Sequence, residues 1–252
     1  MRKLTVLTLI AGMALAQGDK KKPGQGRMLV PRWEKGGRAK VLVTITRTSR
    51  VVTQIFDTTT RVITDCRYEQ TAIEVKDGRP VRAKRKFTKY ETKTITTTKG
   101  RRSASSEMNK HTLAGRTIEL VREKGVLKPV TEPPQVDTNE LMTAGPDWLW
   151  LLPEGPVKVK DTWTIQSGWH FLVIHAVFVG NNTTCKLEKL SNGVASIRFT
   201  AGPRCNGLAK FSRTHGRFTH VEYEFETKEF DVSMQTKVTF DQKRLPAKKK
   251  KS

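Results

Sequence analysis

Three glutamates alternate along one strand-like stretch of the chain: Glu222, Glu224 and Glu226. In a β-strand, side chains two residues apart share a face and lie within about 7 Å of each other. That spacing is within the range of the paired carboxylates of glycoside hydrolases, so a hydrolase using Glu222 and Glu224 is one alternative. Because the chain is strongly basic, we expect the ladder instead to balance basic strands such as Arg82 to Lys86 across the sheet.

A second cluster mixes basic and aromatic residues, as proteins that bind polyanions often do. The predicted polyanion-binding residues are Arg82, Lys84, Arg85, Lys86, Lys89, Lys248, Lys249, Lys250 and Lys251. Of two aromatic residues here, Phe87 lies among the first five and Tyr90 directly follows Lys89. In a strand they face opposite ways, so only one of them could stack on a base.

Four tryptophans follow in the middle of the chain: Trp148, Trp150, Trp163 and Trp169. Clustered aromatic residues are usually buried, which favours a core role. The alternative is that they line the mouth of a site for a lipid or a glycan.

Cysteine chemistry has little support. The chain has three cysteines, Cys66, Cys185 and Cys205, so at most one internal disulfide can form. A tight turn at Asn192-Gly193 would place Cys185 opposite Thr200, and whether Cys185 and Cys205 are bridged stays open. No spacing of Cys and His suits a metal, and no nucleotide-binding or nucleophile motif occurs. The sequence therefore predicts no metal, no cofactor and no catalytic residue.

Residues 1–16 have the pattern of a secretory signal peptide. Arg2 and Lys3 precede an apolar stretch too short to span a bilayer, and Ala14-Leu15-Ala16 forms a cleavage site before Gln17. No cysteine stands directly after that site, where a lipoprotein would need one, and no later apolar run reaches the length of a transmembrane helix. We therefore expect an exported protein, periplasmic or extracellular, with no membrane span in the mature chain.

The charge points to a polyanionic partner. The chain has 47 Lys and Arg against 24 Asp and Glu, a formal charge of +23, which becomes +21 without Arg2 and Lys3. So large an excess attracts polyanions through the release of condensed counterions. Outside the cytoplasm, anionic lipid or polysaccharide is the expected partner, nucleic acid is disfavoured, and a protein partner is the alternative.

Stretches of Thr, Val and Ile in alternation recur from residue 41 to residue 240, which favours strands over helices. Val51 to Tyr68 is one continuous strand-like stretch, and Phe171 to Val179 is an apolar one. The one expected helix is short, near residues 139–143. The sequence predicts an all-β fold, an antiparallel curved sheet or a partly closed barrel or sandwich. We expect a basic flexible linker over residues 17–30, a β domain over 31–242, with two similar halves meeting near 145–160 as an option, and a basic disordered tail over 243–252.

One hairpin can be given a register. Asp77-Gly78 lies between two strand-like runs, and a tight turn there pairs Tyr68 with Phe87 and Glu69 with Lys86. Both pairs are favourable across neighbouring strands. Further on, the apolar positions switch from odd to even near Lys228, which indicates a bulge or a turn.

The segment Leu151-Leu152-Pro153-Glu154-Gly155-Pro156-Val157-Lys158-Val159-Lys160-Asp161-Thr162-Trp163 resembles the Leu-Pro-x-x-x-Val-x-Val-Gly-Asp-x-Trp pattern of uncharacterised exported bacterial β proteins. Leu113-Ala114-Gly115 and Val75 to Gly78 are similar to two other motifs of these proteins, so the resemblance spans Glu74 to Trp163. Lys160 stands where the pattern has glycine, so a positive φ there would be strained. The resemblance implies export and a β fold, and it brings no assigned activity.

Together these features predict a non-enzymatic exported protein that binds an anionic envelope component, lipid or polysaccharide, through a basic surface. The alternative is an envelope structural or assembly protein that binds another protein.

Overall fold

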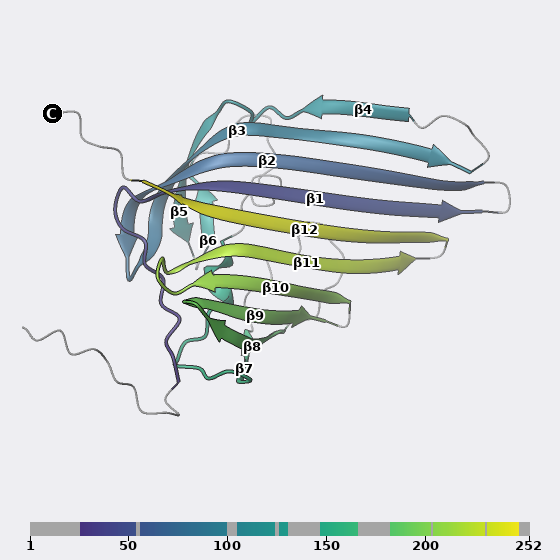
Figure 1. The fold of residues 1–252 in the computed structure, drawn as a ribbon. Helices are drawn as coiled ribbons and strands as arrows, with labels where there is room; N and C mark the ends of the chain where they lie inside the picture. Colours follow the sequence, from purple (N-terminus) through teal and green to yellow (C-terminus); the bar gives the residue numbers. More distant parts are fainter. Residues whose placement is uncertain are drawn as a thin grey trace, which may run out of the picture.

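The computed structural model describes residues 26–53, 56–99, 105–123, 126–130, 147–165, 182–202, 204–229 and 231–246. These residues form one antiparallel sheet of twelve strands together with a single turn of 3₁₀ helix (Figure 1). Strands β6 and β7 are the two ends of the sheet path and do not pair with each other, so the sheet is not closed. The predicted all-β antiparallel fold is confirmed.

The elements in chain order are β1 (Arg38–Val52), β2 (Asp57–Lys76), β3 (Arg79–Thr98), β4 (Ser105–Lys110), β5 (Thr117–Glu123), β6 (Val126–Pro129), the 3₁₀ helix η1 (Trp148–Leu151), β7 (Thr162–Ile165), β8 (Thr183–Ser191), β9 (Val194–Ala201), β10 (Cys205–Ser212), β11 (Arg217–Glu229) and β12 (Val232–Leu245). In space their order is β6-β5-β3-β2-β1-β12-β11-β10-β9-β8-β7, and β4 pairs with the far end of β3.

Strands β1 and β12 join two meanders at the middle of the sheet. Within each meander the paired strands follow one another in the chain, except that β3 pairs with β5 beyond β4. By contrast, β1 and β12 are far apart in the chain and pair over almost their whole length. Val43 lies opposite Phe240, and Lys40 lies opposite Lys243. This long-range pairing positions the site described below.

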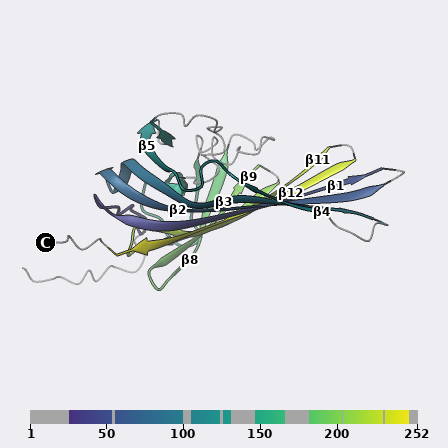
Figure 2. The same cartoon turned by 90° about the horizontal axis from the view of Figure 1, so that it is seen from above.

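The sheet has two regions of different character (Figure 2). At one end it curves into a trough that β5 to β9 help to form. At the other end it continues as a thin arm made of residues 46–52, 57–64, 92–98, 105–110 and 232–235, none of which is fully buried. Cross-strand threonine pairs support the arm, with hydroxyl oxygens 3.2 Å apart in both Thr58–Thr98 and Thr64–Thr92.

The core fills the trough because apolar residues alternate along the central strands. In β1, Val41, Val43 and Ile45 face inward and are buried, while the residues between them face out. Helix η1 lies against this concave side. Its first residue, Trp148, is 2% exposed, and its ring centroid lies 5.7 Å from that of Tyr223.

Asp77 and Gly78 have φ values of 51° and 70°, as a tight hairpin turn requires. The predicted pairs Tyr68–Phe87 and Glu69–Lys86 are both present.

The Asn192-Gly193 turn also forms, with φ values of 48° and 76°. The register shifts by one residue between Leu187 and Lys189, so Cys185 lies opposite Phe199 and not Thr200. A β-bulge of this kind has no signal in the turn itself.

Three predicted boundaries change. Leu29 is 3% exposed within the core, so the fold begins inside the expected linker. Strand β12 runs to Leu245, so Lys243 and Arg244 belong to the sheet and not to the tail. The continuous β stretch expected from residue 51 onward is interrupted by a turn closed by Thr53 and Phe56, where no glycine marks it.

The odd-to-even switch expected near Lys228 corresponds to the end of β11 and the start of β12. The expected signal peptide, the 139–143 helix and the apolar run 171–179 lie outside the described residues.

Residues 26–37 cross the end of the trough and are called the strap here. The Arg32 N–H donates to Gly216 O (3.0 Å) and the Trp33 N–H to Gly78 O (2.9 Å), while Arg27 pairs with Val157. The strap therefore ties the β10–β11 hairpin to the β2–β3 hairpin. Within the described part of the chain, no helix is long and apolar enough to cross a membrane.

Candidate functional site

A groove of about 700 Å³ lies across the outer face of β1, β2 and β12. Its lining sets Leu42 of β1 among charged side chains: Lys40 from β1, Arg67 and Glu69 from β2, and Asp241 and Lys243 from β12, with Thr88 and Thr219 at its sides. Val41, Tyr68 and Gln242 also line it. We call it the outer groove. Its lining residues come from both meanders, so the pairing of β1 with β12 creates it.

Lys40 and Lys243 are directly opposite each other in the β1–β12 register. Both are exposed, and neither lies within 4 Å of a carboxylate in the described part of the chain. Like charges facing each other across strands destabilise a sheet. An anion bound between the two ammonium groups would remove that repulsion.

The acidic groups of the outer groove already have partners. Arg38 donates to Glu69 at 2.6 Å, and Asp241 lies 2.7 Å from the His220 ring nitrogen. Glu69 also lies directly opposite Lys40 in the β1–β2 register, but its carboxylate is bonded to Arg38 and not to Lys40.

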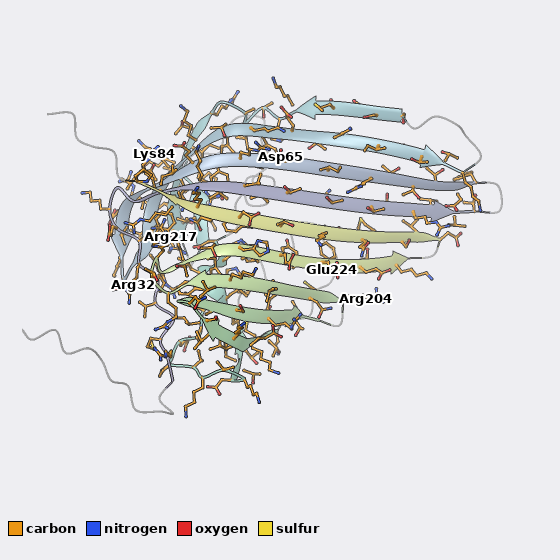
Figure 3. All side chains as sticks on the ribbon, viewed as in Figure 1. Arg32, Asp65, Lys84, Arg204, Arg217 and Glu224 are labelled. Carbon is orange, nitrogen blue, oxygen red and sulfur yellow. The ribbon has the colours of Figure 1, made fainter. Side chains whose placement is uncertain are left out.

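More cations extend the basic surface beyond the groove. Lys86 lies opposite Glu69 on the same outer face, and Lys84 lies one step further along β3, near the end of the sheet (Figure 3). Glu119 pairs with both Arg82 and Lys84. The basic surface of this end thus comprises the cations Arg38, Lys40, Arg82, Lys84, Lys86 and Lys243, and its carboxylates include Glu69, Glu74, Glu119 and Asp241.

The predicted polyanion-binding residues do not form one exposed group in the structure. Arg82, Lys84 and Lys86 are exposed on the outer face. Lys89 is paired with Asp65 at 2.9 Å and with Glu91 at 3.1 Å. The residues Lys248, Lys249, Lys250 and Lys251 lie outside the described residues.

Arg85 is not part of the outer surface. It shares the inward phase of β3 with Ala83 and Phe87 and is only 4% exposed. Its Nε donates to Gln70 Oε1 at 2.8 Å, and its guanidinium lies 4.9 Å from the centre of the Tyr68 ring. The strand alternation assigns it to the trough, although its basic neighbours suggested a surface position.

The tryptophans do not form one open mouth in the described part of the chain. Trp148 is inside the core beside Phe199 and Phe240. Trp150 and Trp163 are half-buried against the same core, and the Trp163 Nε1–H donates to Leu151 O at 3.1 Å. Trp169 lies outside the described residues.

The glutamate ladder lies on the outer face, as the alternation predicted, and Val221, Tyr223 and Phe225 face the core. Its basic neighbours differ from the expected ones. Three strands separate β11 from β3, and Glu224 lies opposite Lys237 of β12.

Two hollows lie along the ladder. One of about 180 Å³ has Arg198, Glu222, Glu224 and Lys237 in its lining, and one of about 440 Å³ has Arg204, Glu224, Glu226 and Lys228. Figure 3 shows Glu224 and Arg204 on this part of the sheet. Cations accompany the carboxylates throughout, so the ladder is balanced locally.

The three cysteines are buried and free. Burial raises the pKa of each thiol to about 12, which disfavours the reactive thiolate. Among the described residues, no three His, Cys, Asp or Glu side chains gather as a metal site would require.

Sequence reasoning missed Lys40 and Lys243. Lys243 was assigned to the basic tail and Lys40 was not singled out, and only the register between β1 and β12 brings them together. No local pattern could have found this pair.

No family model matches the sequence. No curated protein matches it either. One matching solved structure is titled as lipid–protein interactions in lipovitellin, with 12% identity and a TM-score of 0.53 over 88% of this chain. Only 27% of the lipovitellin chain is covered, so this chain spans about a quarter of that protein. A β-barrel-like protein of the domain of unknown function DUF1849 from Brucella abortus aligns over 88% of this chain and all of its own, at 13% identity and a TM-score of 0.24. In fold, the described sheet is therefore similar to part of lipovitellin.

Proposed function

We propose that this protein is a non-enzymatic binding protein that holds an anionic lipid in the outer groove. The observation that carries the proposal is the pair Lys40 and Lys243, two facing ammonium groups at a groove whose lining includes Leu42. Neither lies within 4 Å of a carboxylate in the described part of the chain. A phosphate-bearing head group would neutralise both lysines, and the apolar part of the lining would contact the adjoining hydrocarbon.

The fold supports the choice of lipid over other anions. The solved chain of similar fold belongs to lipovitellin, whose structure was described for its lipid–protein interactions. We also propose that the protein is exported, as residues 1–16 suggest, so that it meets its lipid outside the cytoplasm. Protein recovered from outside the cytoplasm should then begin at Gln17, and a retained Met1 would contradict export.

Vesicle flotation tests the proposal. We expect the protein to float with vesicles of phosphatidylcholine and phosphatidylglycerol and not with phosphatidylcholine alone, and binding should weaken as sodium chloride rises. The Lys40→Gln/Lys243→Gln variant should bind about tenfold more weakly. This factor corresponds to roughly 1.4 kcal/mol for the loss of two surface cations near the bilayer.

The matched control is Lys186→Gln/Lys210→Gln, which removes the same charge from exposed positions elsewhere on the outer face. We expect it to bind within twofold of the unaltered protein. Equal losses in both variants would show a response to net charge alone and would contradict a site in the groove. Retention on an acidic polysaccharide such as alginate, without vesicle binding, would contradict the lipid.

A further inference from the structure

A second cluster of basic groups lies inside the molecule, away from the outer groove. A cavity of about 30 Å³ lies at the strap end of the trough. Arg85 from β3 and Arg217 from β11 both line it, and they are only 4% and 3% exposed. Figure 3 shows Arg217 near the strap residue Arg32, at this end of the sheet.

Neither arginine has a carboxylate within 4 Å in the described part of the chain. Arg85 makes one hydrogen bond, from Nε to the amide oxygen of Gln70. Arg217 makes two long ones, to His215 O at 3.4 Å and Arg38 O at 3.5 Å, and its guanidinium lies 3.9 Å from the centre of the Trp33 ring. A guanidinium has five N–H donors, so most donors of both groups have no acceptor among the described residues.

A third donor lines the same cavity. The indole Nε1–H of Trp148 is buried and has no hydrogen-bond partner among the described residues. Buried donors are nearly always paired, and buried charges nearly always have a counter-charge. Burial also lowers the pKa of Arg217 to about 10, as expected for a cation without a close counter-ion.

The carboxylate that lines this cavity, Asp147, is already engaged by Arg122. With that pair neutral, Arg85 and Arg217 leave the cavity with an excess of two positive charges. The described lining of the cavity therefore carries an excess of positive charge, and the amide oxygen of Gln70 already accepts from Arg85.

We propose that this cavity binds a carboxylate, held by Arg85 and Arg217 with the Trp148 indole N–H as a further donor. The planar fork of a guanidinium matches the two oxygens of a carboxylate. A volume of 30 Å³ holds about two water-sized groups, which suits a carboxylate better than the larger tetrahedral phosphate. The ligand is a free small carboxylate or the head of a fatty acid, and the site is separate from the outer groove.

Nuclear magnetic resonance of the indole N–H groups tests the site directly. Sodium formate replaces sodium chloride at constant ionic strength, and the Trp148 resonance should shift and saturate. The matched control is Trp150, whose Nε1–H is also buried and unpartnered but which does not line the cavity. Trp148→Phe and Trp150→Phe identify the two resonances. A Trp148 resonance that does not move, or that moves together with Trp150 without saturation, overturns the proposal.

Substitution of an arginine gives a second measurement. Arg85→Lys keeps a positive charge but removes the planar fork, so formate should bind at least tenfold more weakly. The groove variant Lys40→Gln/Lys243→Gln should bind formate as the unaltered protein does, so failure of the lipid proposal and failure of this one can be distinguished. Unchanged formate affinity in Arg85→Lys contradicts the assigned role, and the Trp148 titration decides the matter if that variant does not fold.

A titration with laurate identifies the source of the carboxylate. Displacement of formate by laurate, with the same Trp148 shift, assigns the head of a fatty acid to the cavity. A response to formate but not to laurate assigns a free small carboxylate. A response to neither overturns the proposal.

Discussion

Lys160 has a left-handed backbone conformation, with φ of 79°, in the turn that leads into β7. The turn is held firmly: the Lys158 N–H donates to Asp161 Oδ2 at 2.8 Å, and the Lys160 N–H donates to Leu187 O at 2.7 Å. These bonds hold Lys160 in a conformation that glycine would adopt more readily. The pattern of the exported β proteins has glycine at this position, so the strain at Lys160 is the one that the resemblance implied.

Lys160→Gly should therefore stabilise the protein, by about 1 kcal/mol, because glycine removes the steric cost of the positive φ. The free energy of unfolding in urea measures the effect. The control is Lys158→Gly in the same turn, where φ is not positive and glycine should not stabilise. Equal effects of the two substitutions would mean that the turn stores no strain at Lys160.

The cysteines give a second prediction at the scale of single residues. Because burial raises the pKa of each thiol to about 12, the folded protein at pH 8 should not react with Ellman's reagent. In denaturant without reductant, three thiols should react, since all three cysteines are free. A count of one would reveal a disulfide between two of them. Because the thiols ionise in the unfolded chain near pH 9 but in the folded protein only near pH 12, the free energy of unfolding should fall as pH rises from 9 toward 12.

Arg85 shows how far the sequence alone can predict which face of a strand a residue occupies. Alternation with Ala83 and Phe87 was enough to assign it to the inner face, but its charge and its neighbours Lys84 and Lys86 favoured the surface. Periodicity was the better guide here, because the pleat of a strand fixes which way each side chain points. The signal for the inner site was thus in the sequence.

At the scale of elements, the strap depends on two glycines in the hairpins beneath it. A Cβ on Gly78 would lie 2.1 Å from Pro31 O, and one on Gly216 would lie 2.2 Å from the Arg32 nitrogen. Both residues also have positive φ. The close approach of strap and hairpins therefore requires glycine at both positions.

Gly78→Ala and Gly216→Ala should each destabilise the protein by about 2–4 kcal/mol, from the positive φ and from displacement of the strap. The control is Gly115→Ala, where φ is +84° but no atom lies within 4 Å of the new Cβ, so only the backbone cost of about 1 kcal/mol remains. Urea unfolding compares the three. If all three variants lost the same stability, the strap contact would contribute nothing.

Turn chemistry explains which elements could be predicted. Asp77-Gly78 and Asn192-Gly193 predicted the β2–β3 and β8–β9 hairpins, since only a few residue types accept two successive positive φ values. The turn closed by Thr53 and Phe56 has no such residue, so the sequence predicted a continuous β stretch there. The bulge near Lys189 depends on packing between strands and was equally invisible.

At the scale of the whole molecule, the pairing of β1 with β12 could not be predicted. It joins segments about two hundred residues apart, and each strand alone carries only an alternating pattern that would suit many partners. The outer groove and the inner cavity both depend on it, because their linings combine residues from the two meanders. This is why composition predicted a basic binding surface while its location needed the structure.

The contrast between the filled trough and the thin arm gives the last prediction. Strands β1 and β2 run through both regions with one continuous pairing register. In the trough their inward side chains are buried, whereas no residue of the arm is fully buried. Opening the arm exposes little apolar surface, so its hydrogen bonds should break without unfolding the core.

Amide hydrogen exchange should therefore differ along the same two strands. Averaged over residues 41–45 and 66–70, the free energy of opening should approach that of global unfolding. Over residues 48–52 and 58–62 it should be lower by at least about 2 kcal/mol. The trough region and the arm region of one strand serve as controls for each other, because both belong to the same ladder of hydrogen bonds. Uniform protection along β1 and β2 would contradict this, and would mean that the arm unfolds only together with the trough.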